Sequence, residues 1–376
     1  MQIVNWQPDN FFASLLLATL LAGATTLGAI ANSSAASPPC FPAPTSTSTP
    51  PAKATSWQEI PLSPRASYQG SVLALSPNGC VVAEGDNQTI RFWNLAEGTA
   101  IRSVSSFPEL PTETRLNAIT FSPDGKVLAA SLYLPEKQTL RIKLWDVASG
   151  RELRSITSRV TPKVYGRGAD GSPLYMLVSN IVFSPDGRLL VGVAGGNSKV
   201  QVWDWSQRKV IKTFVGGDGT ALAFSRDGRS LASGSEQAIY LWDLASQRLI
   251  RRLSSKYPLG NFVFSPDNTM LFSTSKAAPG NTAKSIQVWN VKTGQPIRRF
   301  GAAHWSSQII FSPDGRIAAM GGPNSSLSFI DLMRGQTLLQ TDNVYPGWSG
   351  LMAFDQSGTV FLMATGSEVK LWQRSQ

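Results

Sequence analysis

The sequence predicts an all-β protein in which seven similar four-stranded units follow an N-terminal segment outside the fold. First, the phrase Phe-Ser-Pro-Asp-Gly or a variant of it occurs seven times, at steps of 46, 62, 41, 40, 47 and 43 residues. Second, a strand-like run ending in Trp follows most copies of this phrase. Third, 32 Gly and 24 Pro make the chain rich in turns. A period near 40–45 residues is typical of the four-stranded blade of a β-propeller, so we expect a seven-bladed β-propeller.

The first 31 residues are predicted to be a signal peptide or a membrane anchor. Residues 11–31 carry no charge, and Ala29-Ile30-Ala31 has the small residues that signal peptidase requires. The same run is just long enough to span a bilayer as a helix, and a start codon assigned too early is a third alternative. Residues 32–56 are rich in Pro, Ser and Thr and are expected to be a disordered linker. A signal and an anchor would both place residues 57–376 outside the cytoplasm.

Each repeat contains a hairpin turn whose residues have separate tasks. Pro sets φ at the first turn position, Asp bonds back to the backbone, and Gly takes the positive φ. Apolar runs on both sides of the turn, for example 118–121 and 127–130, are expected to be the first two strands. The seven copies of the turn phrase are 75–79, 121–125, 183–187, 224–228, 264–268, 311–315 and 354–358.

The third strand of the unit ends in Trp, and the fourth carries an aliphatic residue followed by a base. Alternation such as Ile142-Lys143-Leu144-Trp145 gives a strand one buried and one exposed face. The bases of the fourth strand are interpreted as edge charges that oppose strand-to-strand aggregation, spread around the rim and not gathered in a patch. The repeated Trp residues are Trp93, Trp145, Trp203, Trp242, Trp289 and Trp372, and the bases are Arg102, Arg154, Lys212, Arg251 and Arg298.

These features resemble the Trp-Asp (WD) repeat β-propeller family over residues 57–376. The resemblance implies a rigid, non-catalytic platform for protein assembly. Two copies depart from the pattern, because Ile330 precedes Asp331 in the sixth and Gln373 follows Trp372 in the seventh. The family's Gly-His dipeptide, whose His ties a hydrogen-bonded tetrad inside the blade, is absent from six copies, and only His304 stands near its position. No blade is therefore expected to form a full tetrad, and hydrophobic packing must stabilise the blades.

The two ends of residues 57–376 predict how the propeller closes. The chain stops four residues after Trp372, so the seventh unit lacks a fourth strand of its own. The segment 57–62, Trp-Gln-Glu-Ile-Pro-Leu, precedes the first unit. We expect this segment to pair as the outer strand of the last blade, and its deletion to lower the melting temperature sharply.

The connections of variable length are expected on one face of the propeller, opposite the short turns. They carry aromatic and basic residues, and function often lies on loops held by a rigid scaffold. Tyr and Trp are enriched at interface hot spots. The predicted partner-binding residues are Tyr133, Tyr165, Tyr175, Trp305, Tyr345 and Trp348, with Arg159, Lys163 and Arg167 as bases.

Several other kinds of site are disfavoured by the sequence. One His and two Cys argue against zinc and against acid–base or triad chemistry, so no catalytic residue, metal or cofactor is expected. Residues 166–171 spell a dinucleotide fingerprint, but no strand-to-helix context surrounds them, and a flexible loop is predicted. A net charge of +10 favours acidic partners, yet no nucleic-acid module is present and a nucleic-acid partner is not expected.

The two cysteines leave two states open. A disulfide between Cys40 and Cys80 would be possible outside the cytoplasm, whereas a buried free thiol at Cys80 is the preferred interpretation. The sequence as a whole predicts an exported or membrane-tethered interaction scaffold that binds one or more proteins through the variable face. A membrane contact is expected only through an uncleaved N-terminal segment. The alternative is a propeller that binds a small ligand or an anionic cell-envelope polymer through the same face.

Overall fold

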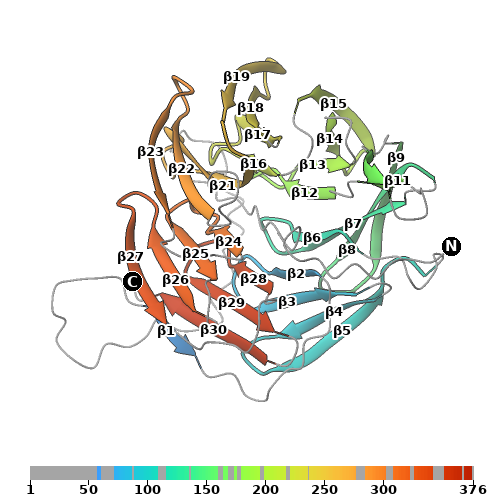
Figure 1. Ribbon diagram of the computed structural model, residues 1–376. Coiled ribbons are helices and arrows are strands. Elements are labelled where there is room, and N and C mark those ends of the chain that lie inside the picture. Colours follow the sequence, from blue (N-terminus) through green and yellow to red (C-terminus); the bar gives the residue numbers. More distant parts are fainter. Residues whose placement is uncertain are drawn as a thin grey trace, which may run out of the picture.

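Seven four-stranded antiparallel sheets are arranged around a common centre as a β-propeller, with no helix among the described residues (Figure 1). This computed structural model confirms the all-β fold class and the number of blades. The structure describes residues 57–60, 72–86, 89–108, 116–134, 137–159, 164–167, 173–175, 179–194, 199–216, 221–235, 237–276, 284–301, 308–321, 326–341, 351–365 and 368–374.

The first three blades each contain four consecutive strands from the centre of the propeller to its rim. Blade 1 consists of β2 (Val72–Leu75), β3 (Val81–Gly85), β4 (Thr89–Asn94) and β5 (Thr99–Ser105). Blade 2 consists of β6 (Ala118–Phe121), β7 (Val127–Leu134), β8 (Thr139–Asp146) and β9 (Glu152–Arg159). Blade 3 consists of β12 (Ser179–Phe183), β13 (Leu189–Ala194), β14 (Lys199–Asp204) and β15 (Lys209–Val215).

The same strand order continues in blades 4 to 6. Blade 4 consists of β16 (Leu222–Phe224), β17 (Ser230–Gly234), β18 (Ala238–Asp243) and β19 (Arg248–Ser254). Blade 5 consists of β20 (Leu259–Phe264), β21 (Met270–Lys276), β22 (Lys284–Asn290) and β23 (Pro296–Gly301). Blade 6 consists of β24 (Gln308–Phe311), β25 (Ile317–Gly321), β26 (Leu327–Asp331) and β27 (Gln336–Thr341).

Blade 7 joins the two ends of the described chain. Its inner strands are β28 (Leu351–Phe354), β29 (Val360–Thr365) and β30 (Glu368–Arg374), and its outer strand is β1 (Trp57–Ile60). The pairing of β1 with β30 is antiparallel and runs from Trp57 opposite Arg374 to Ile60 opposite Leu371. The predicted closure is therefore confirmed for residues 57–60, and residues 61 and 62 lie outside the described residues.

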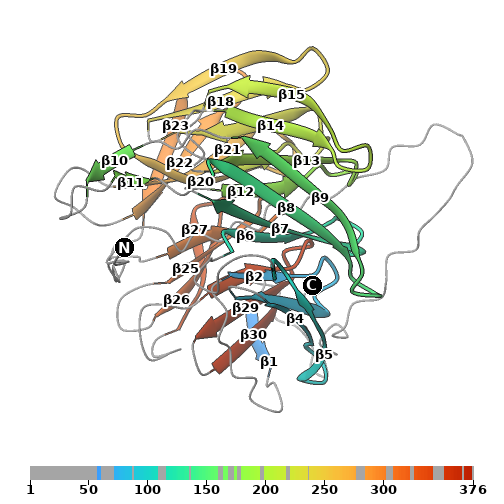
Figure 2. The same cartoon turned by 90° about the vertical axis from the view of Figure 1, so that its right-hand side faces the viewer.

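The antiparallel order of the strands gives the propeller two different faces. The turns from first to second strand and from third to fourth strand share one face, which we call the short-turn face. The connections from second to third strand and from one blade to the next share the opposite face, the long-loop face. An additional two-stranded sheet, β10 (Val164–Arg167) and β11 (Pro173–Tyr175), follows β9 on the long-loop side (Figure 2).

The repeated turn phrase forms the same hydrogen-bonded hairpin in successive blades. In blade 2, the Ser122 hydroxyl donates to Asp124 Oδ1 (2.6 Å) and accepts from the Val127 amide (2.9 Å). Asp124 Oδ1 also accepts from the Lys126 amide (3.0 Å), and Gly125 has a φ of 71°. Ser and Asp thus satisfy backbone amides that the tight turn would otherwise leave unpaired.

Apolar side chains of neighbouring blades form shared core clusters. One cluster joins blades 6 and 7 and includes Trp57, Phe329 and Phe354. The repeated Trp residues all lie on the third strand of their blades, and five of the six are buried while Trp93 is half-buried. Hydrophobic packing between the blades is therefore continuous at these seams.

Part of the tetrad persists despite the missing histidines. The Trp242 indole N–H donates to Ser233 Oγ (2.9 Å), whose hydroxyl donates to the Gly216 carbonyl (2.9 Å). In blade 5, Trp289 donates to Ser273 in the same way (2.8 Å). The prediction that packing alone stabilises the blades is thus incomplete, because Trp–Ser pairs keep these buried N–H groups satisfied.

The outer strands of blades 1 to 6 share a β-bulge, which directly precedes the fourth-strand base in blades 1 to 5 and Leu339 in blade 6. In blade 4, Leu241 lies opposite Arg251 and Trp242 opposite Leu249, so that Ile250 is the extra residue. Arg251 then turns toward the next blade and donates to the Thr293 carbonyl (3.4 Å). In the same way Arg298 donates to the Met333 carbonyl of blade 6. These arginines link blades, a role that the edge-charge interpretation did not include.

Candidate functional site

The predicted partner-binding residues divide into those on described strands and those outside the described residues. Arg159 ends β9 and is exposed, Tyr133 lies on β7 opposite Leu140, and Tyr165, Arg167 and Tyr175 lie on the β10–β11 hairpin. Lys163, Trp305, Tyr345 and Trp348 lie outside the described residues, as does His304.

The β10–β11 hairpin brings two of the predicted tyrosines into one small sheet. Val164 lies opposite Tyr175, Gly166 lies opposite Leu174, and a bulge separates these two pairs at Tyr165. The prediction of a flexible loop over 166–171 is therefore wrong for Gly166 and Arg167, which belong to a strand. The sequence signal was the alternating Val-Tyr-Gly-Arg run, too short to outweigh the surrounding glycines.

A second aromatic group on the long-loop face is Tyr257, in the connection from β19 to β20. The Arg299 guanidinium lies 4.9 Å from the centroid of its phenol ring and the Lys256 ammonium 5.8 Å from it. Tyr257 is half-buried, so its ring contacts these cations and retains some exposure. Phe107, another aromatic residue of the variable connections, is instead buried beneath Lys143 and belongs to the core.

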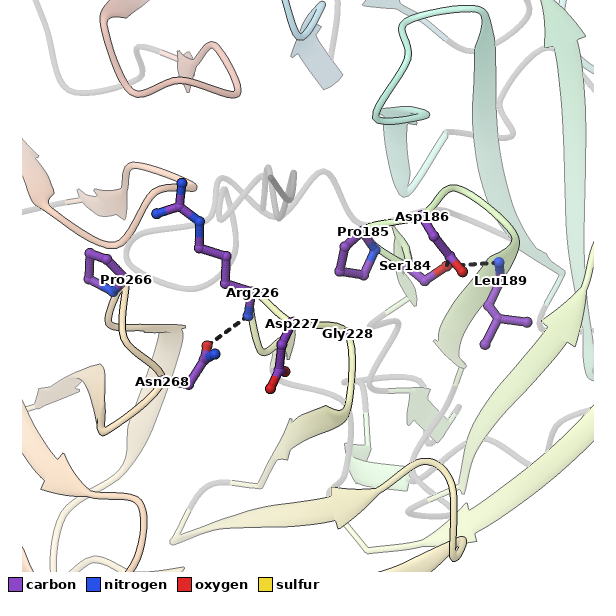
Figure 3. Close-up of a pocket in the computed structure, with 9 residues that line it drawn as sticks. All are labelled: Ser184, Pro185, Asp186, Leu189, Arg226, Asp227, Gly228, Pro266 and Asn268. Carbon is purple, nitrogen blue, oxygen red and sulfur yellow. Dashed lines mark hydrogen bonds between the residues drawn. The ribbon is translucent and has the colours of Figure 1, made fainter. Parts of the chain in front are cut away.

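The short-turn face contains a cavity of about 450 Å³ between the turns of blades 3, 4 and 5 (Figure 3). Sequence reasoning placed no site on this face. Two carboxylates and one guanidinium line the cavity together with proline rings, so its wall has mixed charge. Its lining residues are Ser184, Pro185, Asp186, Leu189, Arg226, Asp227, Gly228, Pro266 and Asn268.

Two substitutions in the repeated turn shape this cavity. Arg226 stands where most turns have Pro and therefore has an amide N–H that proline lacks. Asn268 stands where the other turns have Gly, at a φ of 60°, and its Oδ1 accepts a hydrogen bond from the Arg226 amide (2.8 Å). The second substitution thus satisfies the donor that the first one creates, and it couples blade 4 to blade 5.

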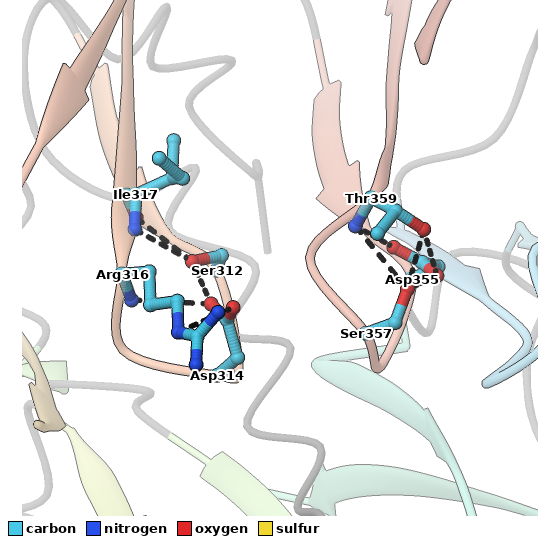
Figure 4. Close-up of polar contacts among 7 residues, drawn as sticks. All are labelled: Ser312, Asp314, Arg316, Ile317, Asp355, Ser357 and Thr359. Atoms are coloured by element: carbon cyan, nitrogen blue, oxygen red, sulfur yellow. Dashed lines mark hydrogen bonds and ion pairs between the residues drawn. The ribbon is translucent and has the colours of Figure 1, made fainter. Parts of the chain in front are cut away.

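The turn of blade 7 exchanges the positions of its acid and its hydroxyl residue (Figure 4). In blade 6, Ser312 accepts from the Ile317 amide (2.9 Å) and donates to Asp314 (2.6 Å). In blade 7, Asp355 takes the position of the serine and accepts from the Val360 amide (2.7 Å), while Ser357 donates to it. The Asp355 carboxylate is buried, and this burial raises its pKa despite the hydrogen bonds.

The state of Cys80 differs from the preferred interpretation. Cys80 is disulfide-bonded and half-buried, so the prediction of a buried free thiol is wrong. The residue precedes β3, which begins at Val81, and its Sγ lies 3.7 Å from the Asn78 carbonyl oxygen at the turn. The other cysteine of the sequence, Cys40, lies outside the described residues.

Within the described ranges, no group of three or more His, Cys, Asp or Glu side chains is placed to hold a metal ion. The same part of the chain contains no helix that is long and apolar enough to cross a bilayer.

Comparison with known proteins supports the resemblance to WD-repeat propellers. The family model described as "WD domain, G-beta repeat" matches residues 171–204 and 208–243. Both matched segments end at a Trp-Asp dipeptide on the third strand of a blade, Asp204 on β14 and Asp243 on β18. The chain therefore carries WD40 repeats, and the resemblance inferred from the sequence is confirmed.

Several relatives are named as WD-repeat proteins. "WD repeat and SOCS box-containing protein 1" of Danio rerio is 28% identical over 193 residues, which cover 50% of this chain and 38% of that protein. An uncharacterized WD repeat-containing protein of Synechocystis is 25% identical over 189 residues, covering 42% of this chain and 53% of that protein. The chain thus spans about half or less of the length of these relatives.

Proposed function

We propose that the chain is an exported, non-catalytic interaction scaffold that binds a protein partner through the long-loop face. WD-repeat propellers generally mediate protein interactions, and the repeats supply a rigid ring on which loops can be displayed. The observation that carries the choice of face is the β10–β11 hairpin, a strand pair added to the blade architecture on that side (Figure 2). A hairpin added on that side, with Tyr165 and Tyr175 in its strands, favours recognition there.

The test is site-specific photo-cross-linking with the full chain. A photoreactive amino acid replaces Tyr165 or Tyr175 on the hairpin, and a matched variant carries it at Arg229 on the short-turn face. Partner proteins should be cross-linked from positions 165 and 175 and not from 229. Equal cross-linking from all three positions, or cross-linking from Arg229 alone, would contradict the choice of face.

Export of the chain is supported by the N-terminal sequence and by the disulfide at Cys80. Disulfides persist in oxidising compartments and are rare in the cytosol, and residues 11–31 have the apolar character of a signal or an anchor. Sequencing of the mature N-terminus in fractionated cells tests the proposal. A mature chain that starts after Ala31 in the soluble exported fraction indicates cleavage, and an intact chain in the membrane fraction indicates an anchor. An intact chain in the cytosol would contradict export.

Binding of an anionic polymer is the second candidate, because Tyr257 is flanked by the cationic groups of Lys256 and Arg299. Polymer binding through Lys and Arg weakens steeply with ionic strength. A salt titration of the captured partner therefore separates this candidate from a protein interface that is anchored by aromatic side chains.

A further inference from the structure

The outer strands of blades 3, 4 and 5 expose aliphatic side chains on one side of the molecule. Ile211, Ile250 and Ile297 are 43%, 46% and 51% exposed, although each is a branched apolar residue. All three are the extra residues of the bulges on β15, β19 and β23, and the bulge turns them away from the sheet. Val210 and Leu249 beside them are exposed as well. These strands are neighbours on the rim of the propeller (Figure 1).

The positive charge of the chain is concentrated on the same three blade edges. The last turns and outer strands of blades 3, 4 and 5, residues 204–216, 243–254 and 290–301, hold nine bases and two acids. The corresponding segments of blades 1, 2 and 6, residues 94–105, 146–159 and 331–341, hold five bases and four acids. Most of these bases therefore lie on three neighbouring blade edges, whereas the five fourth-strand bases named from the sequence lie one to a blade on blades 1 to 5. The nine bases are Arg208, Lys209, Lys212, Arg248, Arg251, Arg252, Lys292, Arg298 and Arg299.

Arg208 occupies a strained position within this patch, which we call the basic rim. The corresponding turn residue is Gly98 in blade 1 and Gly150 in blade 2, both at positive φ. Arg208 has a φ of 57°, a conformation that disfavours residues with a Cβ. Gln247 occupies the same turn position in blade 4 at the same φ of 57°, so the position accepts a side chain with or without a charge, and Arg208 adds an exposed base to the rim there.

We propose that the basic rim docks on an anionic membrane surface, with Ile211, Ile250 and Ile297 entering the headgroup layer between the bases. Affinity for such a surface increases with buried apolar area and with attraction to anionic lipids, and each nearby base adds about 1 kcal/mol. This contact is separate from the N-terminal segment, and it shares only Arg299 with the group around Tyr257 on the long-loop face. It would orient a tethered propeller on its edge, so that the long-loop face remains accessible beside the membrane.

The chemistry of the basic rim fits lipid better than an acidic protein. Protein interfaces are usually anchored by Tyr, Trp or Phe in pockets, whereas the exposed large apolar side chains of the described residues include no aromatic one. The three blade edges also follow the convex rim of the propeller (Figure 1). Mobile headgroups can reach each edge separately, while a folded partner would need a matching concave surface.

The test measures binding of the full chain to vesicles of phosphatidylcholine with and without phosphatidylglycerol. The N-terminal segment is present in every variant, so a difference between variants reports on the propeller. Arg208→Gly removes one charge and relieves the positive φ, and Gln247→Gly relieves the same φ of 57° in blade 4 without a charge change. Arg208→Gly should weaken binding to anionic vesicles about fivefold, and Gln247→Gly should leave it unchanged. Neither variant should lower the melting temperature.

Two variants with four substitutions each distinguish binding through the basic rim from attraction by the net charge of the whole chain. Four exposed bases of the basic rim are changed to Gln, and a matched variant loses four exposed bases elsewhere. The rim variant should bind anionic vesicles at least tenfold more weakly than the matched variant. The rim variant is Arg208→Gln, Lys209→Gln, Arg248→Gln and Lys292→Gln, and the matched variant is Lys126→Gln, Lys137→Gln, Arg151→Gln and Arg229→Gln.

Replacing the three exposed isoleucines distinguishes binding to a lipid surface from binding to an acidic protein. A triple variant, Ile211→Ser, Ile250→Ser and Ile297→Ser, should bind anionic vesicles several-fold more weakly while its binding to soluble polyglutamate stays constant. Unchanged vesicle binding by this variant would overturn the membrane proposal and identify a general anion surface. Equal losses in the rim variant and the matched variant would also overturn it, because attraction would then follow net charge alone.

Discussion

Replacing Trp57 tests whether the N-terminal strand stabilises the closed propeller. Its indole ring stacks on Phe329 of blade 6 at 4.2 Å between centroids and meets Phe354 of blade 7 edge-on at 6.1 Å. Trp57 is 5% exposed, so β1 anchors a side chain in the core between two blades. Trp57→Ala should lower the free energy of unfolding by about 3–5 kcal/mol.

The expected change in melting temperature follows from the size of the domain. Unfolding entropy is about 2.1 cal/mol/K per residue, so roughly 320 residues give about 0.7 kcal/mol/K. Trp57→Ala should then lower the melting temperature by about 4–7 °C. The measurement is thermal unfolding followed by circular dichroism, which does not depend on the lost indole fluorescence.

Trp57→Phe is the matched control, because it keeps an aromatic ring on Phe329. The Trp57 indole N–H is buried without a hydrogen-bond partner, and removal of such a group recovers about 1–3 kcal/mol. The smaller ring leaves a void that costs about 1 kcal/mol, so Trp57→Phe should be near neutral or stabilising. Equal melting temperatures for Trp57→Ala and wild type would refute closure by β1. Equal losses in both variants would show that the stacking geometry is wrong.

The remaining predictions concern the repeated turns. Burial raises the pKa of Asp355, so the protonated carboxyl stabilises the fold at acid pH, and this stabilisation is lost as the pH rises through the folded-state pKa. Asp355→Asn should therefore melt above wild type at pH 7 and lose that advantage toward pH 3. The Ser265 hydroxyl donates a hydrogen bond that lowers the pKa of Asp267, so Asp267→Asn should melt below wild type at pH 7, and this deficit should disappear as the pH falls. Melting temperatures measured from pH 3 to 7 check the direction of both effects. Curves of melting temperature against pH that run parallel to the wild-type curve would contradict them. Gly315→Ala should destabilise far more than Gly125→Ala, as urea titration can measure, because only at Gly315 would a Cβ lie 2.0 Å from a backbone oxygen of the preceding blade, that of Phe264.

The repeat architecture could be predicted because its determinants are local. Pro, Asp and Gly in the turn fix a hairpin by their own backbone preferences, and the Trp of the third strand marks a buried position by alternation. The closure of blade 7 followed from counting strands, since Trp372 lies close to the end of the sequence. The absence of the tetrad histidine from six of the seven copies was also visible, but the Trp242–Ser233 hydrogen bond was not anticipated, because Ser233 lies on another strand.

The features that escaped prediction depend on contacts between blades. The bulge at Ile250 changes the register of one strand pair and has no local sequence mark. Arg251 resembled an edge charge until the neighbouring turn at Thr293 was seen to lie within its reach. Phe107 comes from a variable connection, yet it is buried beneath Lys143. The bases of the basic rim can be counted in the sequence, because blades 3, 4 and 5 are consecutive there, but the exposure of Ile211, Ile250 and Ile297 beside them depends on the bulges.

The blades differ at the proline position of the repeated turn, which holds Arg226 in blade 4 and Gln356 in blade 7. Proline there offers no amide donor, so the turn is complete without its neighbour. Where proline is absent, the new N–H bonds to the next blade: Arg226 donates to Asn268 (2.8 Å) and Gln356 donates to the Pro77 carbonyl (3.3 Å). The second of these bonds joins blade 7 to blade 1 at the seam of the ring, beside the exchanged Asp355 turn. The departures from the repeat are therefore compensated structural variants, and one of them places a free side chain, Arg226, at the cavity of the short-turn face.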